Sequence, residues 1–166
     1  MASGDRLLLF HPSNNEPPAS SYATPDTRNS RPCLDFDAST TERAVFSAVM
    51  PQHYDGSGVT VYLHVAWSSD TNTAHKTRWD VAFELVGDGD LDVDSDDFAA
   101  ANSVSQSVVA TSGHVDITTI AFTDGADMDS VAAGDGFRIY VERDHDHADD
   151  DASGDAELFC LEIQET

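Results

Sequence analysis

Acidic side chains alternate along one stretch of the chain in a pattern that invites a calcium-binding interpretation. The alternating residues are Asp88, Asp90, Asp92, Asp94 and Asp96. An EF-hand loop also needs a glycine at position 6 and a bidentate glutamate at position 12. A loop that begins at Asp88 or at Asp90 has neither of these residues. We therefore expect a solvated acidic loop here, without a bound metal ion.

Histidines provide the second pattern with possible metal chemistry. An HxH pair lies among aspartates at His145 and His147, with Asp144, Asp146 and Asp149. Imidazoles can bind transition metals in cupin-type barrels, but such a site needs further ligands from the barrel interior. His64 and His114 lie on other predicted strands, and nothing in the sequence brings them to this pair. A cupin-like metalloprotein stays an alternative, while we expect no metal ligand and no cofactor.

Patterns typical of nucleophilic catalysis are missing from the sequence. It contains no GxSxG nucleophile elbow and no glycine-rich phosphate loop. Serine and aspartate are so frequent that chance combinations of Ser, His and Asp carry no information. We therefore predict no catalytic residue and no enzymatic activity.

Aromatic side chains could stack on sugar rings and so form a glycan-binding platform. The candidates are Tyr22, Tyr54, Tyr62, Tyr140, Trp67 and Trp79. Both tryptophans fall on the apolar side of alternating segments, where burial in a core is the simpler explanation. A glycan- or receptor-binding module is therefore kept as an alternative function.

The net charge limits the possible partners. The 166 residues include 31 acidic and 8 basic side chains, for a formal net charge of −23 at pH 7. Lys76 is the single lysine. At molar salt the Debye length is only ~3 Å, which screens most of the self-repulsion. The composition is typical of a halophilic protein and argues against binding to nucleic acid or to an anionic membrane.

Apolar and polar residues alternate with a period of two along most of the chain, which predicts an all-β fold. The expected strands are residues 33–37, 43–50, 59–68, 78–86, 104–110, 114–122, 136–143 and 155–164. Eight antiparallel strands joined by loops of mixed length predict a jelly-roll sandwich, with an immunoglobulin-like sandwich as the competing architecture. We also expect a short helix at residues 95–101 and a helical turn at residues 124–133.

The jelly-roll topology makes the first and last of these strands neighbours in one sheet. If Leu34 faces the core, the alternation puts Cys33 and Cys160 on the outer face. The same alternation puts Leu158 outside and Phe159 inside. A disulfide is possible if the two cysteine Cα atoms lie within ~6 Å of each other. Two small buried thiols beneath the N-terminal segment are the alternative.

The N-terminal segment differs in composition from the rest of the chain. Residues 6–10 could form a short strand, and residues 11–32 contain five of the six prolines and show no apolar periodicity. This composition predicts an extended N-terminal arm at residues 1–32 before a sandwich domain at residues 33–166. We expect this arm to contact a neighbouring subunit or another partner. The predicted contact residues are Leu7, Leu8, Leu9, Phe10, Arg28 and Arg31.

One stretch carries a family resemblance. LDFDAST at 34–40 is followed by AVF at 44–46, by Pro51 and by an alternating strand with Trp67. This pattern resembles small β-rich structural proteins of tailed viruses, here of haloarchaeal type, from Thr27 to the C-terminus. The resemblance implies a structural virion protein.

Within that class, the expected function is a capsid decoration (cement) protein that binds the major capsid protein and forms a homotrimer. Such a protein would be made in the cytoplasm of a halophilic host and would lie on the capsid surface. A turret, neck or tail component has the same sequence features and stays an alternative.

Overall fold

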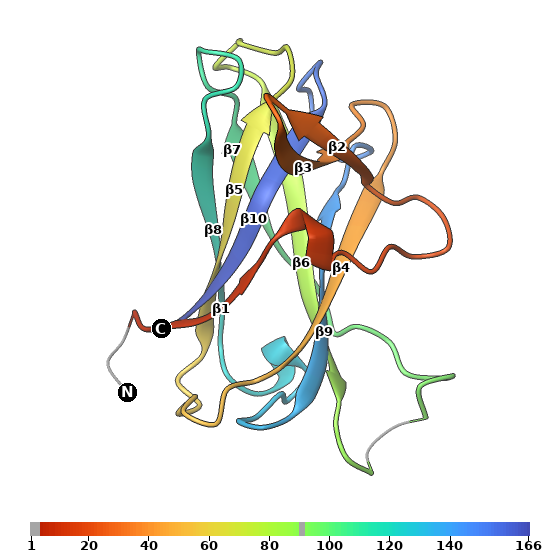
Figure 1. Ribbon diagram of the computed structural model, residues 1–166, viewed down its shortest axis with the longest axis vertical. Helices are drawn as coiled ribbons and strands as arrows, with labels where there is room; N and C mark the ends of the chain where they lie inside the picture. The colour runs from red at the N-terminus through yellow and green to blue at the C-terminus, as the bar shows by residue number, and fades with distance from the viewer. Residues whose placement is uncertain (1–3, 90–91) are drawn as a thin grey trace.

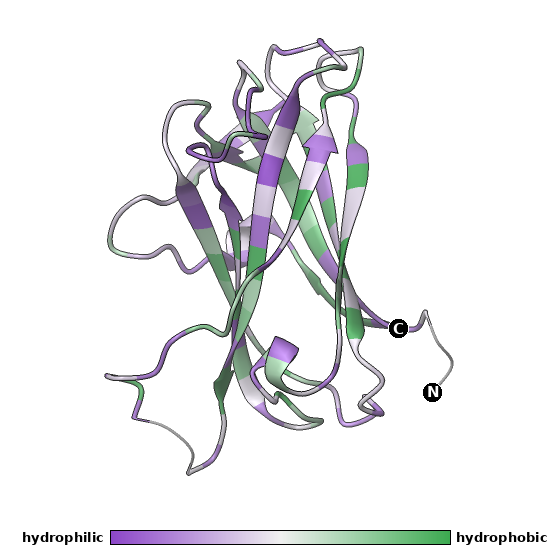
Figure 2. Cartoon of the chain, turned by 180° about the vertical axis from the view of Figure 1, so that it is seen from behind, coloured by the Kyte–Doolittle hydropathy of each residue, from purple (hydrophilic) through white to green (hydrophobic). Residues whose placement is uncertain are grey.

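The computed structural model describes residues 4–89 and 92–166, whose strands form two antiparallel sheets that pack face to face (Figure 1). Hydrophobic and hydrophilic residues alternate as bands along these strands (Figure 2). Sheet A has the spatial order β2 (Thr24–Arg28), β3 (Arg31–Phe36), β10 (Ala156–Glu165), β5 (Val59–Trp67) and β8 (Asp116–Phe122), and β1 (Arg6–Phe10) also pairs with β10. Sheet B has the order β4 (Glu42–Val49), β9 (Gly136–Arg143), β6 (Lys76–Val86) and β7 (Asn102–Ser107).

This connectivity is a jelly roll, as the sequence predicts. The chain passes between the sheets so that β3, β10, β5 and β8 lie in one and β4, β9, β6 and β7 in the other. All eight predicted strands are present, with boundaries that shift by up to three residues. The predicted pairing of the first and last of them is confirmed, because β3 pairs with β10 through Leu34 and Leu158.

The predicted helix at residues 95–101 is wrong. This segment is not helical, and Phe98 packs edge-on against the Tyr140 ring on the outer face of sheet B, with ring centroids 4.8 Å apart. The Ala99 backbone N–H donates to the Phe83 carbonyl oxygen at 2.8 Å, so the segment follows strand β6. The turn expected at residues 124–133 is a short 3-10 helix, Ala126–Met128.

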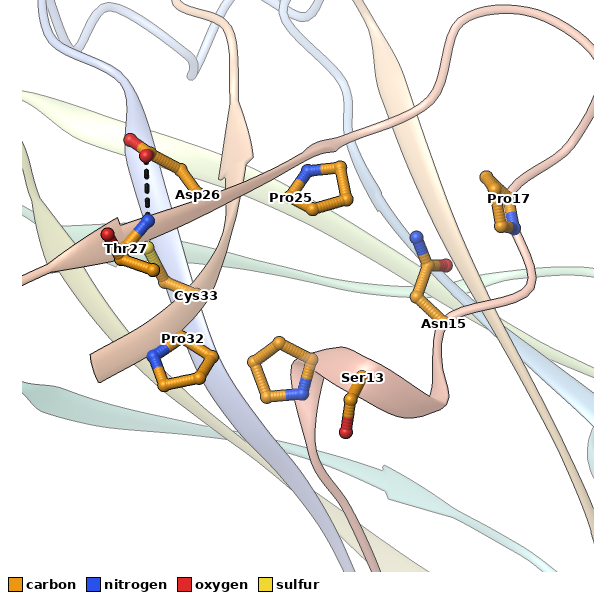
Figure 3. A pocket seen from close by; sticks show the side chains of 9 residues that line it. Ser13, Asn15, Pro17, Pro25, Asp26, Thr27, Pro32 and Cys33 are labelled. Atoms are coloured by element: carbon orange, nitrogen blue, oxygen red, sulfur yellow. Dashed lines mark hydrogen bonds between the residues drawn. The ribbon is translucent and has the colours of Figure 1, made fainter. Parts of the chain in front are cut away.

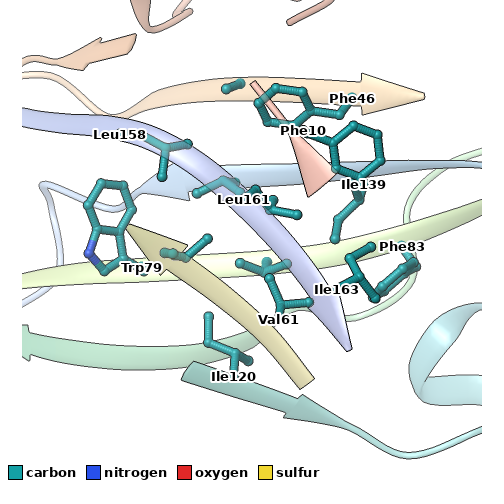
Figure 4. Packing of buried hydrophobic residues seen from close by; sticks show 14 of the residues in the cluster. Phe10, Phe46, Val61, Trp79, Phe83, Ile120, Ile139, Leu158, Leu161 and Ile163 are labelled. Carbon is teal, nitrogen blue, oxygen red and sulfur yellow. The ribbon is translucent and has the colours of Figure 1, made fainter. Parts of the chain in front are cut away.

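Aromatic and aliphatic side chains from both sheets fill the space between them (Figure 4). Trp67 and Trp79 are fully buried, as the alternation predicts. They lie in opposite sheets, Trp67 on β5 and Trp79 on β6. Their indole N–H groups donate to Thr77 Oγ1 at 2.8 Å and to Gln106 Oε1 at 3.0 Å. Each buried donor is therefore satisfied within the core.

The N-terminal segment packs against the sandwich of its own chain, whereas the sequence analysis predicted an extended arm at residues 1–32. Residues 1–3 of that range lie outside the described residues. β1 pairs with β10, and Leu7 and Phe10 are buried in the core of the same chain. The Phe10 ring lies 5.3 Å from the Phe46 ring. The sequence could not indicate this pairing because β1 and β10 are some 150 residues apart. Leu8 is partly buried, and Leu9 is 39% exposed on the outer face.

A β-bulge in β10 reverses part of the predicted alternation. Leu158 pairs with Val65 and Cys160 pairs with His64, so Phe159 is an extra residue between these pairs. Leu158 therefore points into the core and Phe159 points outward, the opposite of the sequence prediction. Cys33 and Cys160 are free thiols in the structure, with Cys33 buried and Cys160 half-buried.

One buried ion pair holds the acidic loop that follows β9. Arg143 and Asp150 are both fully buried, and the guanidinium donates to both carboxylate oxygens at 3.0 and 2.8 Å. The remaining N–H groups donate to backbone carbonyls of Phe36, Ala152 and Gly154. The arginine thus joins strand β3 to the loop between β9 and β10.

Candidate functional site

The metal and catalytic patterns of the sequence do not come together in space. Within residues 4–89 and 92–166, no three His, Cys, Asp or Glu side chains gather closely enough to hold a metal ion. Asp90, which belongs to the predicted acidic loop, lies outside the described residues. No helix of the described chain is long and apolar enough to cross a membrane.

One Asp–His–Ser group occurs, but its hydrogen bonds differ from those of a hydrolase. The Asp70 carboxylate accepts from His75 Nδ1 at 2.8 Å and also from the Ser153 hydroxyl at 3.2 Å. His75 Nε2 faces the Asn72 amide, so the imidazole does not contact the serine. These bonds hold the pKa of Asp70 well below its usual range despite burial. The group fastens two loops together.

One hollow lies between the short 3-10 helix η1 (Pro12–Asn14) and the β2–β3 hairpin (Figure 3). It has a volume of 510 Å³, and proline rings and Cys33 form much of its wall. Its one acidic side chain, Asp26, accepts a hydrogen bond from the Thr27 backbone N–H at 2.7 Å. No aromatic ring or cation lines this hollow, so it offers neither a stacking surface for a sugar ring nor a positive charge for an anion.

The outer face of sheet B carries an aromatic pair that is already covered. Tyr140 is 7% exposed, because the Arg43 guanidinium lies 3.7 Å from its ring centroid and Phe98 packs on its edge. Arg43 is in turn paired with Glu142, and Arg138 with Glu84. This face therefore presents closed ion pairs and no open ring on which a ligand could stack.

The outer face of sheet B also has a groove, of 340 Å³, lined by the ion pair of Glu84 with Arg138 and by aliphatic side chains such as Val86. The outer face of sheet A carries an open groove of 330 Å³ with a different lining. Its lining residues are Arg28, Asn29, Arg31, His64, Gly113, Val115, Phe159 and Cys160. We call this hollow the sheet A groove. It combines one aromatic ring, two guanidinium groups, an imidazole and a side-chain amide, and no carboxylate lines it.

A tight turn places the two arginines of the groove side by side. Asn29 and Ser30 have φ angles of 48° and 63°, the left-handed values of a two-residue hairpin turn. Arg28 and Arg31 are therefore the closing pair of the β2–β3 hairpin and lie directly opposite each other. Asparagine tolerates the left-handed conformation better than most residues do, which explains the sequence at this turn.

Arg28 is fixed by neighbours on three sides. Its guanidinium donates to Glu157 Oε2 at 2.6 Å, to the Trp67 carbonyl oxygen at 3.0 Å and to Ser112 Oγ at 2.9 Å. Gly113 has a φ of 77°, and a Cβ atom there would lie 2.9 Å from Arg28 Cζ. The glycine is thus required both by its backbone and by the close approach of the arginine.

The bulge in β10 supplies the aromatic ring of the groove. Phe159 is the extra residue, and its half-buried ring turns away from the core. His64 on β5 lies next to Cys160, and its Nε2 is 3.6 Å from Glu162 Oε2 without a hydrogen-bond partner in the described chain. Burial raises the pKa of both thiols on this side of sheet A, that of Cys33 to about 11, so neither is an activated nucleophile.

Asp35, on β3, is an acidic residue whose surroundings disfavour its charged form. Burial and the nearby charges of Asp155 and Glu157 raise its pKa to about 6, and its Oδ1 lacks a hydrogen-bond partner. The folded state therefore holds a proton more tightly than the unfolded state, and stability falls as the pH rises from about 4 through 6.

Replacing this carboxyl group by an amide is expected to stabilise the protein at neutral pH. Asp35→Asn should raise the free energy of unfolding by about 1 kcal/mol above pH 6, a value reduced for the partial exposure of the site. The gain should shrink toward pH 4, where Asp35 is protonated. Denaturant unfolding at both pH values measures it. Asp37→Asn is the matched control, since Ser39 lowers the pKa of Asp37; an equal gain in this variant would assign the effect to net charge.

The sequence identified part of the groove. Arg28 and Arg31 were predicted as contact residues, and the structure brings them together, whereas Leu7 and Phe10 lie in the core and away from any partner. Phe159 and His64 were not identified as site residues. No local sequence pattern predicts the bulge that exposes Phe159. The two arginines that flank an Asn-Ser turn do form a local pattern, and it could have predicted the hairpin.

The fold defines the chain as a jelly-roll β-sandwich, and comparison with known proteins agrees. No family model and no curated protein matches the sequence. Among solved structures, a xylan-binding module of family CBM15 superposes with a TM-score of 0.53 at 10% identity, over 96% of this chain and 97% of that chain. The CBM22-2 xylan-binding domain of Xyn10C from Paenibacillus barcinonensis gives a TM-score of 0.53 at 14% identity, over 92% of each chain. At such identities the similarity establishes the fold.

Proposed function

We propose that the protein is a non-catalytic carbohydrate-binding module whose ligand lies in the sheet A groove. The observation that carries this proposal is an open groove with the half-buried ring of Phe159 beside several directional hydrogen-bonding groups. The apolar face of a sugar ring can lie against the phenyl ring, while hydroxyl groups accept from the arginines and Asn29. The groove volume falls within the roughly 300–1,000 Å³ of small-molecule sites.

The similarity of the fold to xylan-binding modules supports this proposal. It also favours the glycan-binding alternative of the sequence analysis over the structural virion function. The groove lacks the activated groups of an enzyme, because neither thiol is acidic and no carboxylate lines it. Binding without catalysis is therefore the activity that these residues support.

A capsid decoration protein is the second candidate function. Exposed apolar side chains on the same face favour it, because Val115 and Ile117 are each 50% exposed and Leu9 is 39% exposed. Such a patch suits a protein partner such as the major capsid protein or a second copy of this chain. The arm that first suggested this function is folded onto its own chain, so the proposal now depends on the exposed patch and on the family resemblance.

Removal of the Phe159 ring is expected to weaken glycan binding by about tenfold or more, the effect of losing an aromatic anchor. Affinity electrophoresis against a panel of soluble polysaccharides, run in molar salt, measures the change. Phe98→Ala is the matched control, because Phe98 is a partly exposed phenylalanine that packs on the outer face of sheet B, away from the groove.

Thermal unfolding of both variants checks that the fold is kept. Equal binding by Phe159→Ala and the parent protein would remove the groove from the proposal. Binding to empty capsids, together with no retardation by any polysaccharide, would favour the decoration function instead.

A further inference from the structure

The few cations of this acidic chain are nearly all neutralised by specific partners. The paired arginines are Arg6 with Glu162, Arg28 with Glu157, Arg43 with Glu142, Arg78 with Asp80, Arg138 with Glu84 and Arg143 with Asp150. Arg31 is the exception among the arginines, since its side chain makes no ion pair or hydrogen bond within the described chain. It lines the sheet A groove and is exposed.

The position of Arg31 is electrostatically unfavourable without a further anion. It lies directly opposite Arg28 at the end of the hairpin, and like charges at opposed positions of an antiparallel pair are destabilising. Glu157 pairs with Arg28 at 2.6 Å, whereas no acidic side chain among residues 4–89 and 92–166 pairs with Arg31. In a chain of net charge −23, an unpaired guanidinium in a groove that no carboxylate lines favours an added negative group.

From this arrangement we propose that the groove selects an acidic glycan and that Arg31 binds its anionic group, a sugar carboxylate or a sulfate. This inference rests on the proposed function and names the class of ligand. The planar guanidinium donates two parallel hydrogen bonds to such an oxyanion. Arg28, held by Glu157, Ser112 and Trp67, stays in place and donates to neutral hydroxyl groups. Phe159 supports the ring that carries the anion.

The test compares polymers that differ in charge alone. Polygalacturonate is measured against its carboxyl-reduced neutral form, and a sulfated galactan against its desulfated form, by isothermal titration in 2 M NaCl. At this salt concentration the Debye length is shorter than ~3 Å, so general repulsion by the acidic surface is screened and the difference reports contact within the groove. We expect at least one acidic polymer to bind about tenfold to a hundredfold more tightly than its neutral partner.

Two variants assign the difference to Arg31. Arg31→Gln should reduce the ratio of acidic to neutral affinity to near one, because it should weaken binding of the acidic polymer far more than binding of the neutral polymer. Lys76→Gln removes the same charge from an exposed position outside the groove and should leave the preference intact. If Arg31→Gln abolishes the preference for polygalacturonate over its reduced form, the recognised group is a carboxylate. If it abolishes the preference for the sulfated galactan over its desulfated form, the group is a sulfate.

The outcomes separate this inference from the proposed function. Equal binding of acidic and neutral polymers, with loss of both in Phe159→Ala, would overturn the acidic preference and leave the glycan-binding function standing. A preference that survives in Arg31→Gln would also overturn it. Absence of binding to every polymer would remove both.

Discussion

Replacing Arg143 with alanine is expected to lower the free energy of unfolding by about 3–5 kcal/mol, because it leaves the Asp150 carboxylate buried without its counter-charge. Three backbone carbonyl groups lose their donor in the same step. Against a total stability of about 5–15 kcal/mol, this loss is a large fraction of the free energy of unfolding. Denaturant unfolding in molar salt, followed by tryptophan fluorescence, measures it.

Two further variants distinguish the ion pair from a general loss of charge. Arg78→Ala removes an arginine whose contact with Asp80 is partly exposed and 3.3 Å long, so its cost should stay below about 1 kcal/mol. Arg143→Lys keeps the charge but cannot make the bidentate contact with Asp150, so most of the loss should remain. Equal losses of unfolding free energy in Arg78→Ala and Arg143→Ala would show that burial of the Arg143–Asp150 pair does not increase the cost of breaking it.

The sequence could have indicated Arg143 as an internal residue. In β9 the core positions are Phe137, Ile139 and Val141, and the next position of the same alternation is Arg143. A charged residue at a core position is rare and calls for a buried partner. The partner itself, Asp150, lies in a loop crowded with aspartates, and only the folded backbone selects it.

The jelly roll was predictable for a simple reason. Each strand buries one side, so residues such as Val61 and Leu63 mark the core face by a period of two. Features that break this period were not predictable. The bulge at Phe159 inserts one residue and turns a ring outward, and it creates the aromatic part of the groove. The site thus combines a locally encoded hairpin at Arg28 and Arg31 with an irregularity that arises from pairing distant strands.

The position of the N-terminal segment also arises from the pairing of distant strands, β1 with β10. It gives the second large expected effect. Replacing Phe10 with alanine should lower the free energy of unfolding by about 3–5 kcal/mol, the usual cost of removing a buried phenyl ring and leaving a cavity. The ring is 6% exposed and packs against Phe46 at the contact of β1 with the core. Deletion of residues 1–30 should cost more, since it removes Leu7 and Phe10 and leaves the edges of β10 and β3 unpaired.

A substitution one position away provides the control, because Leu9 on the same strand is 39% exposed and should cost less than about 1 kcal/mol when replaced by alanine. The dependence on protein concentration then separates two arrangements of the segment. If β1 pairs with β10 of its own chain, the loss in Phe10→Ala is the same in dilute and concentrated samples. If the segment instead inserts into a neighbouring subunit, as an assembling arm would, stability must rise with protein concentration in the parent chain. Such a dependence would overturn the intramolecular pairing, and it would return the N-terminal segment to the role of a contact between subunits.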